Sequence, residues 1–128
     1  MIKISVDEAR AYDEWVILQL KIVTNEGTSP VDLYFAEERL LKEIKEQVGV
    51  ERHNTIQKSR EFLRLLGANS MVFDRIRTMK ADGERPGDAT YIDQHNYQRY
   101  LYKKALQEKF FPNSKLTEVK LGYESKKS

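Results

Sequence analysis

Recurrent helix-start signals constrain the fold of this chain more than any other feature of its sequence. The first turn of a helix has unpaired N–H groups, which a side-chain oxygen just before it satisfies. The letters S-V-D-E at 5–8 match a capping box and predict a helix over about 6–24. Ser29 followed by Pro30 predicts a second helix, which Gly49 ends after Val48. Apolar residues recur at helical spacing after each start, which favours an all-α fold.

Two further helices are expected in the middle of the chain. The letters N-T-I-Q at 54–57 predict a helix that begins at or before Asn54 and ends at Gly67. Asn69 and Ser70 then offer a cap for a short helix that Gly83 closes. Apolar residues at helical spacing support both predictions.

A loop precedes the last predicted helix. The segment 81–88 holds two glycines and a proline among charged residues, a composition typical of loops. The letters T-Y-I-D at 90–93 open a helix that ends near Phe110, because Pro112 cannot continue it. Since 128 residues is the usual size of one domain, we expect a single bundle of four to five helices over 1–123.

The two ends of the chain differ from the rest in pattern. Residues 1–4 and 116–121 have the composition of short strands, and we expect a small antiparallel ribbon to join them. Residues 124–128 are expected to form a flexible basic tail. The chain has no apolar stretch of membrane-spanning length, and its N-terminus turns acidic where a signal peptide would turn apolar. We therefore expect a cytoplasmic protein without membrane contacts.

Residues that often carry catalysis or bind metals are scarce. The absence of cysteine excludes thiolate nucleophiles, disulfides and cysteine-based zinc sites. Neither His53 nor His95 stands in the Glu-x-x-His motif of di-iron bundles. A Glu-x-x-Glu pair at 43–46 lacks the Glu-x-x-Asp partner of magnesium-dependent pyrophosphohydrolases, and no glycine-rich phosphate loop is present. We expect no metal and no cofactor, and the sequence favours a non-enzymatic protein without deciding the matter.

The richest local pattern lies at 91–104, where four tyrosines stand among amides and cations. Helical spacing places Asn96, Arg99 and Lys103 on one side of the helix. Their side chains could donate hydrogen bonds to a phosphate or carboxylate there. The simpler interpretation is that some tyrosines are buried and the cations form a solvated surface. Residues 95–128 also hold eight Lys or Arg against three Asp or Glu, an excess that attracts nucleic acids.

Several motifs together resemble a known family. M-I-K-I-S at 1–5 and D-E-W-V-I-L-Q-L-K at 13–21 are similar to the M-I-K-I-S and D-K-L-[ST]-I-L-x-[IL]-K of an uncharacterised family of small helical bacterial proteins, a domain of unknown function. F-D-R-I-R at 73–77 and N-Y-Q-R at 96–99 are similar to two later motifs of that family. The resemblance implies a helical fold and no known activity. It singles out six polar positions: Asp13, Lys21, Asn69, Arg77, Asn96 and Arg99.

Three functional hypotheses follow. The first is a non-enzymatic binding or assembly module that forms a homodimer through Trp15, Tyr97 and Tyr100. The second is a small all-α enzyme or sensor whose polar side chains converge on an anionic metabolite. Its expected site residues are Lys21, Arg77, Asn96, Arg99 and Lys103. The third is weak, sequence-nonspecific nucleic-acid binding through residues 95–128.

Overall fold

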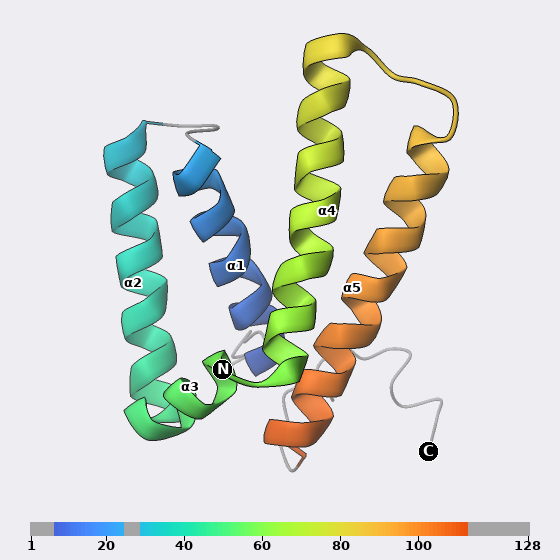
Figure 1. Ribbon diagram of the computed structural model, residues 1–128. Helices are drawn as coiled ribbons and strands as arrows, with labels where there is room; N and C mark the ends of the chain where they lie inside the picture. The colour runs from blue at the N-terminus through green and yellow to red at the C-terminus, as the bar shows by residue number, and fades with distance from the viewer. Residues whose placement is uncertain (1–6, 25–28, 113–128) are drawn as a thin grey trace, which may run out of the picture.

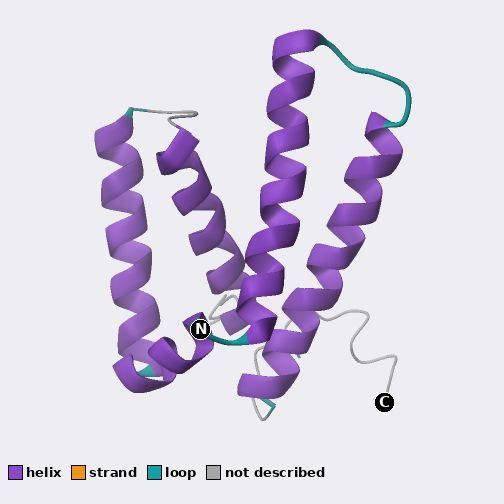
Figure 2. Cartoon of the chain, in the orientation of Figure 1, coloured by secondary structure: helices purple, strands orange, loops and turns teal. Residues whose placement is uncertain are grey.

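The computed structural model describes residues 7–24 and 29–112. These residues form five helices: α1 (Glu8–Thr24), α2 (Pro30–Val48), α3 (Val50–Gln57), α4 (Arg60–Asp82) and α5 (Asp88–Phe110). Figure 2 shows helices, loops and no strand in this part of the chain. The predicted all-α fold with four to five helices is confirmed. The ribbon predicted for 1–4 and 116–121 and the tail at 124–128 lie outside the described residues.

The helices form two antiparallel hairpins joined by α3 (Figure 1). Helices α1 and α2 make one hairpin, and α4 and α5 make the other. Helix α1 packs against α2, α4 and α5, whereas the main neighbours of α2 are α1 and α3. Helix α1 is therefore the central element, and a side chain on it can meet residues from both halves of the sequence.

Local capping signals set several of the observed helix boundaries. The Ser29 hydroxyl accepts a hydrogen bond from the Asp32 N–H at the start of α2, and Pro30 is the first helical residue, as predicted. Gly49 ends α2 and Gly83 ends α4, each with a positive φ that glycine adopts at no steric cost. These boundaries are confirmed because each signal acts within one helical turn.

The predicted boundary between two middle helices is wrong. Helix α4 continues through Gly67, and Asn69 and Ser70 lie in its interior, so neither starts a helix. Asn54 likewise lies inside α3, and Ser59 caps α4 by accepting a hydrogen bond from the Phe62 N–H. A glycine inside a helix costs about 1 kcal/mol. The buried face of α4 spans both sides of this glycine and offsets that cost: Phe62, Leu65, Ala68, Asn69 and Val72.

The hydrophobic core lies at the end of the bundle where α1 begins. Tyr12, Trp15 and Phe62 pack their rings edge-on or tilted against one another, with centroids 5.8 to 6.2 Å apart. All five helices supply apolar or aromatic side chains to this region: Val16, Ile44, His53, Ile56, Leu65 and Leu106. Farther along α1, Val23, two turns beyond the buried Val16, is exposed.

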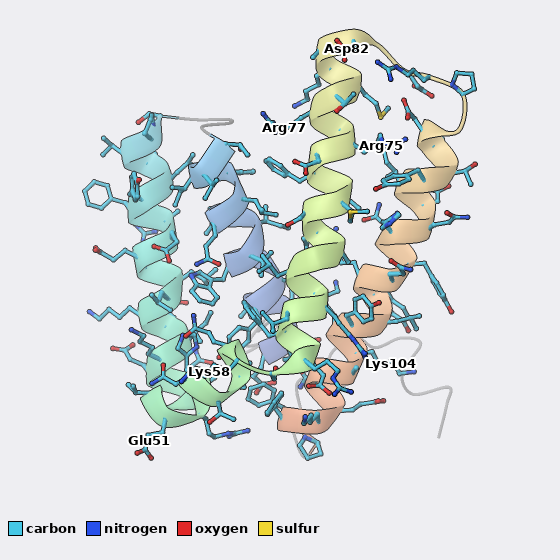
Figure 3. The ribbon with its side chains drawn as sticks, viewed as in Figure 1. Glu51, Lys58, Arg75, Arg77, Asp82 and Lys104 are labelled. Carbon is cyan, nitrogen blue, oxygen red and sulfur yellow. The ribbon has the colours of Figure 1, made fainter. Side chains whose placement is uncertain are left out.

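Polar contacts fasten α5 to its neighbours at both ends. Near its C-terminal end, Gln107 Oε1 accepts a hydrogen bond from the Ala9 N–H at the start of α1, and Gln107 Nε2 donates to Glu8. At the other end, Arg75 on α4 pairs with Asp88 at 2.7 Å and lies over the Tyr91 ring. Figure 3 shows Arg75 near that end of the α4–α5 hairpin. The contacts of Gln107 with Ala9 and Glu8 therefore join the first and last helices, between residues almost a hundred positions apart.

Candidate functional site

The most concentrated polar feature of the described residues is a cluster centred on Asp13, which we call the Asp13 cluster. Arg99 on α5 donates to both Asp13 carboxylate oxygens, from Nε at 2.9 Å and from Nη2 at 2.6 Å. Asn69 on α4 donates from Nδ2 to Asp13 Oδ1 at 2.8 Å and to the Leu65 carbonyl at 3.0 Å. Asn96 accepts a further hydrogen bond from Arg99. Three helices thus meet at one carboxylate.

The charges in this cluster stabilise one another. Burial disfavours ionisation of Asp13, but the hydrogen bonds from Arg99 and Asn69 and the positive charges of Arg99 and Lys103 outweigh it, so the pKa of Asp13 lies below its usual range. The hydrogen bond to Asp13 raises the pKa of Arg99. Asp13 is therefore a carboxylate at neutral pH, with its hydrogen-bonding capacity committed to protein partners. Such a group is suited to holding helices in register rather than to proton transfer.

A second buried polar contact lies in the aromatic core. The Tyr12 hydroxyl and His53 Nδ1 are 2.8 Å apart, and their rings stack with centroids 5.7 Å apart. Burial, with a contribution from the charge of Lys45, lowers the pKa of His53, and burial raises the pKa of Tyr12. Nearby, Trp15 Nε1 donates to Glu37 at 2.7 Å. Among the described residues, no fully buried side-chain nitrogen or oxygen lacks a hydrogen-bond partner, so these contacts serve to satisfy polar groups inside the core.

The predicted anion-binding residues do not form one site. Arg99, Asn96 and the half-buried Lys103 are close together, but the Arg99 guanidinium is engaged by Asp13. Lys21 follows Asp13 by eight residues on α1, and Arg77 follows Asn69 by eight on α4, so each lies about 12 Å farther along its helix. Arg77 also pairs with Asp74 at 3.6 Å. The sequence could not reveal that Arg99 is already paired, because its partner Asp13 is 86 residues away.

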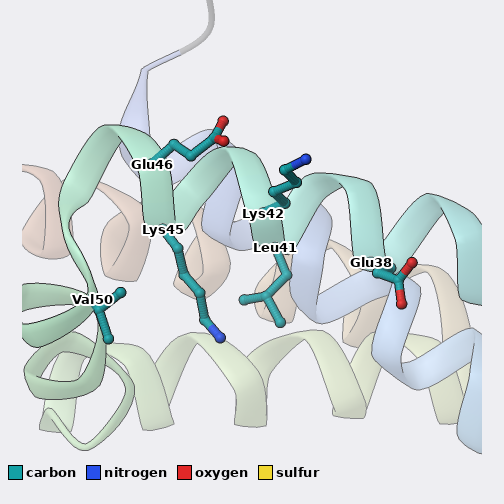
Figure 4. A pocket seen from close by; sticks show the side chains of 6 residues that line it. All are labelled: Glu38, Leu41, Lys42, Lys45, Glu46 and Val50. Carbon is teal, nitrogen blue, oxygen red and sulfur yellow. The ribbon is translucent and has the colours of Figure 1, made fainter.

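The described residues contain no group of three or more His, Asp or Glu side chains placed to hold a metal ion. A surface hollow of about 380 Å³ lies along α2 and the start of α3. Figure 4 shows the side chains that line it. Five of its six lining residues are exposed, so a small molecule there would stay in contact with solvent. None of the predicted site residues lines this hollow. Its lining consists of Glu38, Leu41, Lys42, Lys45, Glu46 and Val50.

A different surface carries exposed aromatic residues. On the side of α5 that faces away from the core, Tyr97, Tyr100 and Leu101 are 62%, 51% and 40% exposed. The two tyrosine rings stack with centroids 6.2 Å apart. Asp93 and Lys104, both exposed, lie one helical turn before and after the tyrosines. We call these five residues the α5 outer strip.

The three residues expected at an interface have different surroundings. Tyr97 and Tyr100 are exposed, as an interface requires, whereas Trp15 is 2% exposed and packs between Tyr12, His53 and Phe62. The expectation for Trp15 is therefore wrong, because its helix face is covered by the rest of the same chain. Sequence reasoning did not group Asp93 and Lys104 with these tyrosines. Their spacing from the tyrosines by four or seven residues was the signal that could have identified them.

Part of the stretch considered for nucleic-acid binding is described, up to Pro112. Two of its cations pair within the chain, Arg99 with Asp13 and Lys109 with Glu61 at 3.2 Å.

Among the described helices, none has both the length and the apolar character needed to cross a bilayer. Comparisons with protein-family models, with curated proteins and with solved structures find no match to this chain.

Proposed function

We propose that this protein is a non-enzymatic binding and assembly module that forms a homodimer through the α5 outer strip. The supporting observation is that α5 has apolar and aromatic side chains on two sides. One side packs Leu106 into the core, and the other leaves Tyr97 and Tyr100 more than half exposed. A helix that is apolar on more than one side indicates a second packing surface.

Tyrosines are suited to such a surface. Each ring brings a large apolar area with few rotatable bonds, and its hydroxyl remains able to bond to water or to a partner. The rings of Tyr97 and Tyr100 already stack on each other, and this contact favours particular rotamers of both before a partner binds. Less side-chain entropy is therefore lost on association.

A second copy of the chain suits the strip because its charges balance. Asp93 and Lys104 lie on opposite sides of the tyrosines along the helix, so the strip has one acidic end and one basic end. A surface with this arrangement can be complementary to itself, as a two-fold interface requires. The anionic-metabolite hypothesis has less support, because Asp13 already engages Arg99, the central cation of that hypothesis.

Sedimentation velocity of the full chain over a range of micromolar concentrations tests the proposal. We expect a monomer–dimer equilibrium that Tyr97→Ala with Tyr100→Ala shifts at least tenfold toward monomer. Tyr34→Ala on α2, which removes a tyrosine of similar exposure, is the matched control and should leave the equilibrium unchanged. A wild-type protein that stays monomeric throughout would refute the proposed function, as would dimerisation unaffected by the double substitution.

A further inference from the structure

We infer that the two copies pair with their α5 helices antiparallel, with a two-fold axis passing between Gln98 and Arg99. This inference rests on the proposed function and specifies how the α5 outer strip meets itself. It is carried by the spacing and the charges of four exposed residues: Asp93, Tyr97, Tyr100 and Lys104.

The spacing of these four residues reads the same in both directions. The steps between them are four, three and four residues, so the pattern is symmetric about its midpoint. Residues three and four apart lie on one side of a helix, and the strip therefore faces a single direction over about three turns. A two-fold axis at the midpoint superimposes the pattern on itself when the second helix runs the opposite way.

The charges favour this orientation over its alternatives. In the antiparallel arrangement, Asp93 is level with Lys104 of the second copy, and symmetry repeats this opposite-charge pair at the other end. In a parallel arrangement, Asp93 would meet Asp93 and Lys104 would meet Lys104. In an antiparallel pairing centred between Tyr100 and Leu101, Asp93 would meet the exposed Glu108. Like charges opposed across an interface disfavour both alternatives.

The aromatic residues fit the same register. Tyr97 and Tyr100 lie on either side of the proposed axis, so their counterparts in the second copy are brought to the same height along the helix. The four rings then surround the axis, and the charged pairs lie at the two ends. An aromatic centre with a polar rim is the usual anatomy of a specific interface.

Disulfide trapping tests the register directly, because the natural chain has no cysteine. The double variant Asp93→Cys with Lys104→Cys should form a covalent dimer under oxidising conditions, and neither single variant should. Within one chain these positions are about 16 Å apart, too far for a disulfide. Covalent dimers formed by the single variants, or none formed by the double variant, would overturn the inference.

Charge reversal gives an independent test by sedimentation velocity. Asp93→Lys alone and Lys104→Asp alone should each weaken dimerisation at least fivefold, since each creates two like-charge pairs. The combined variant restores opposite charges and should recover wild-type association. A dimer that the single reversals do not weaken, or that the combined variant does not restore, would refute the register and leave the proposed function standing. A monomeric wild-type protein would refute both.

Discussion

The Asp13 cluster makes a specific prediction about stability. Asp13→Ala removes the carboxylate that Arg99 contacts with two hydrogen bonds and Asn69 with one. Arg99 then loses its counter-charge, and the Asn69 amide keeps only the Leu65 carbonyl as an acceptor. The helices α1, α4 and α5 lose their shared polar contact, so we expect the whole domain to be less stable.

The size of the effect follows from burial. Removing one partner of a buried ion pair costs about 3–5 kcal/mol. The Asp13 side chain is 4% exposed and that of Arg99 is 27% exposed, so water can partly solvate the guanidinium once it is unpaired. We therefore expect the lower end, about 3 kcal/mol. With a urea dependence of about 1.5 kcal/mol per M, the unfolding midpoint should fall by about 2 M.

Urea unfolding followed by far-ultraviolet circular dichroism measures this loss. The matched control is Glu14→Ala, which breaks the exposed Arg10–Glu14 pair at 3.7 Å on the same helix. That variant should lose less than about 1 kcal/mol, because exposed ion pairs contribute little. If Asp13→Ala were no more destabilising than Glu14→Ala, the Asp13 cluster would not hold the helices together.

Two further predictions concern pH and the interior of α4. Because burial lowers the pKa of His53, the unfolded chain binds more protons than the folded chain below pH of about 6.5. Stability should therefore decline as pH falls from that value through the folded pKa, and His53→Gln should flatten this dependence in urea titrations; an unchanged slope would contradict the assignment. Gly67→Ala should raise stability by about 0.5–1 kcal/mol, since a Cβ there meets nothing within 4 Å. Gly83→Ala, at φ +86°, should lower the melting temperature instead, and the same sign for both would refute the reasoning.

Four of the six polar positions singled out from the sequence lie together in the fold, whereas Lys21 and Arg77 lie farther along their helices. Asp13, Asn69, Asn96 and Arg99 belong to three different helices and meet in one cluster. Sequence spacing grouped Arg99 with Asn96 and Lys103 on α5, and in the structure Arg99 donates a hydrogen bond to Asn96. The spacing did not identify the Asp13 carboxylate as the partner of Arg99. Periodicity predicts which residues are neighbours on one helix, not which residues meet across the bundle.

Local signals in the sequence were sufficient to determine the helical class and several helix ends. Ser29, Pro30, Gly49 and Gly83 act within one turn of the backbone, so their effect does not depend on the rest of the chain. Only the tertiary structure decided that α4 passes through Gly67, since burial of its apolar face outweighs the local cost of a glycine.

The tertiary structure also decided the roles of individual side chains. Trp15 and Tyr97 are both large aromatic residues on helices. Residue type alone does not determine which of them is buried and which is exposed. Helix α3 and the start of α4 cover Trp15 with His53 and Phe62, whereas the described helices leave most of Tyr97 uncovered. Which face of a helix is buried depends on the elements that pack against it, and those contacts join residues far apart in the sequence.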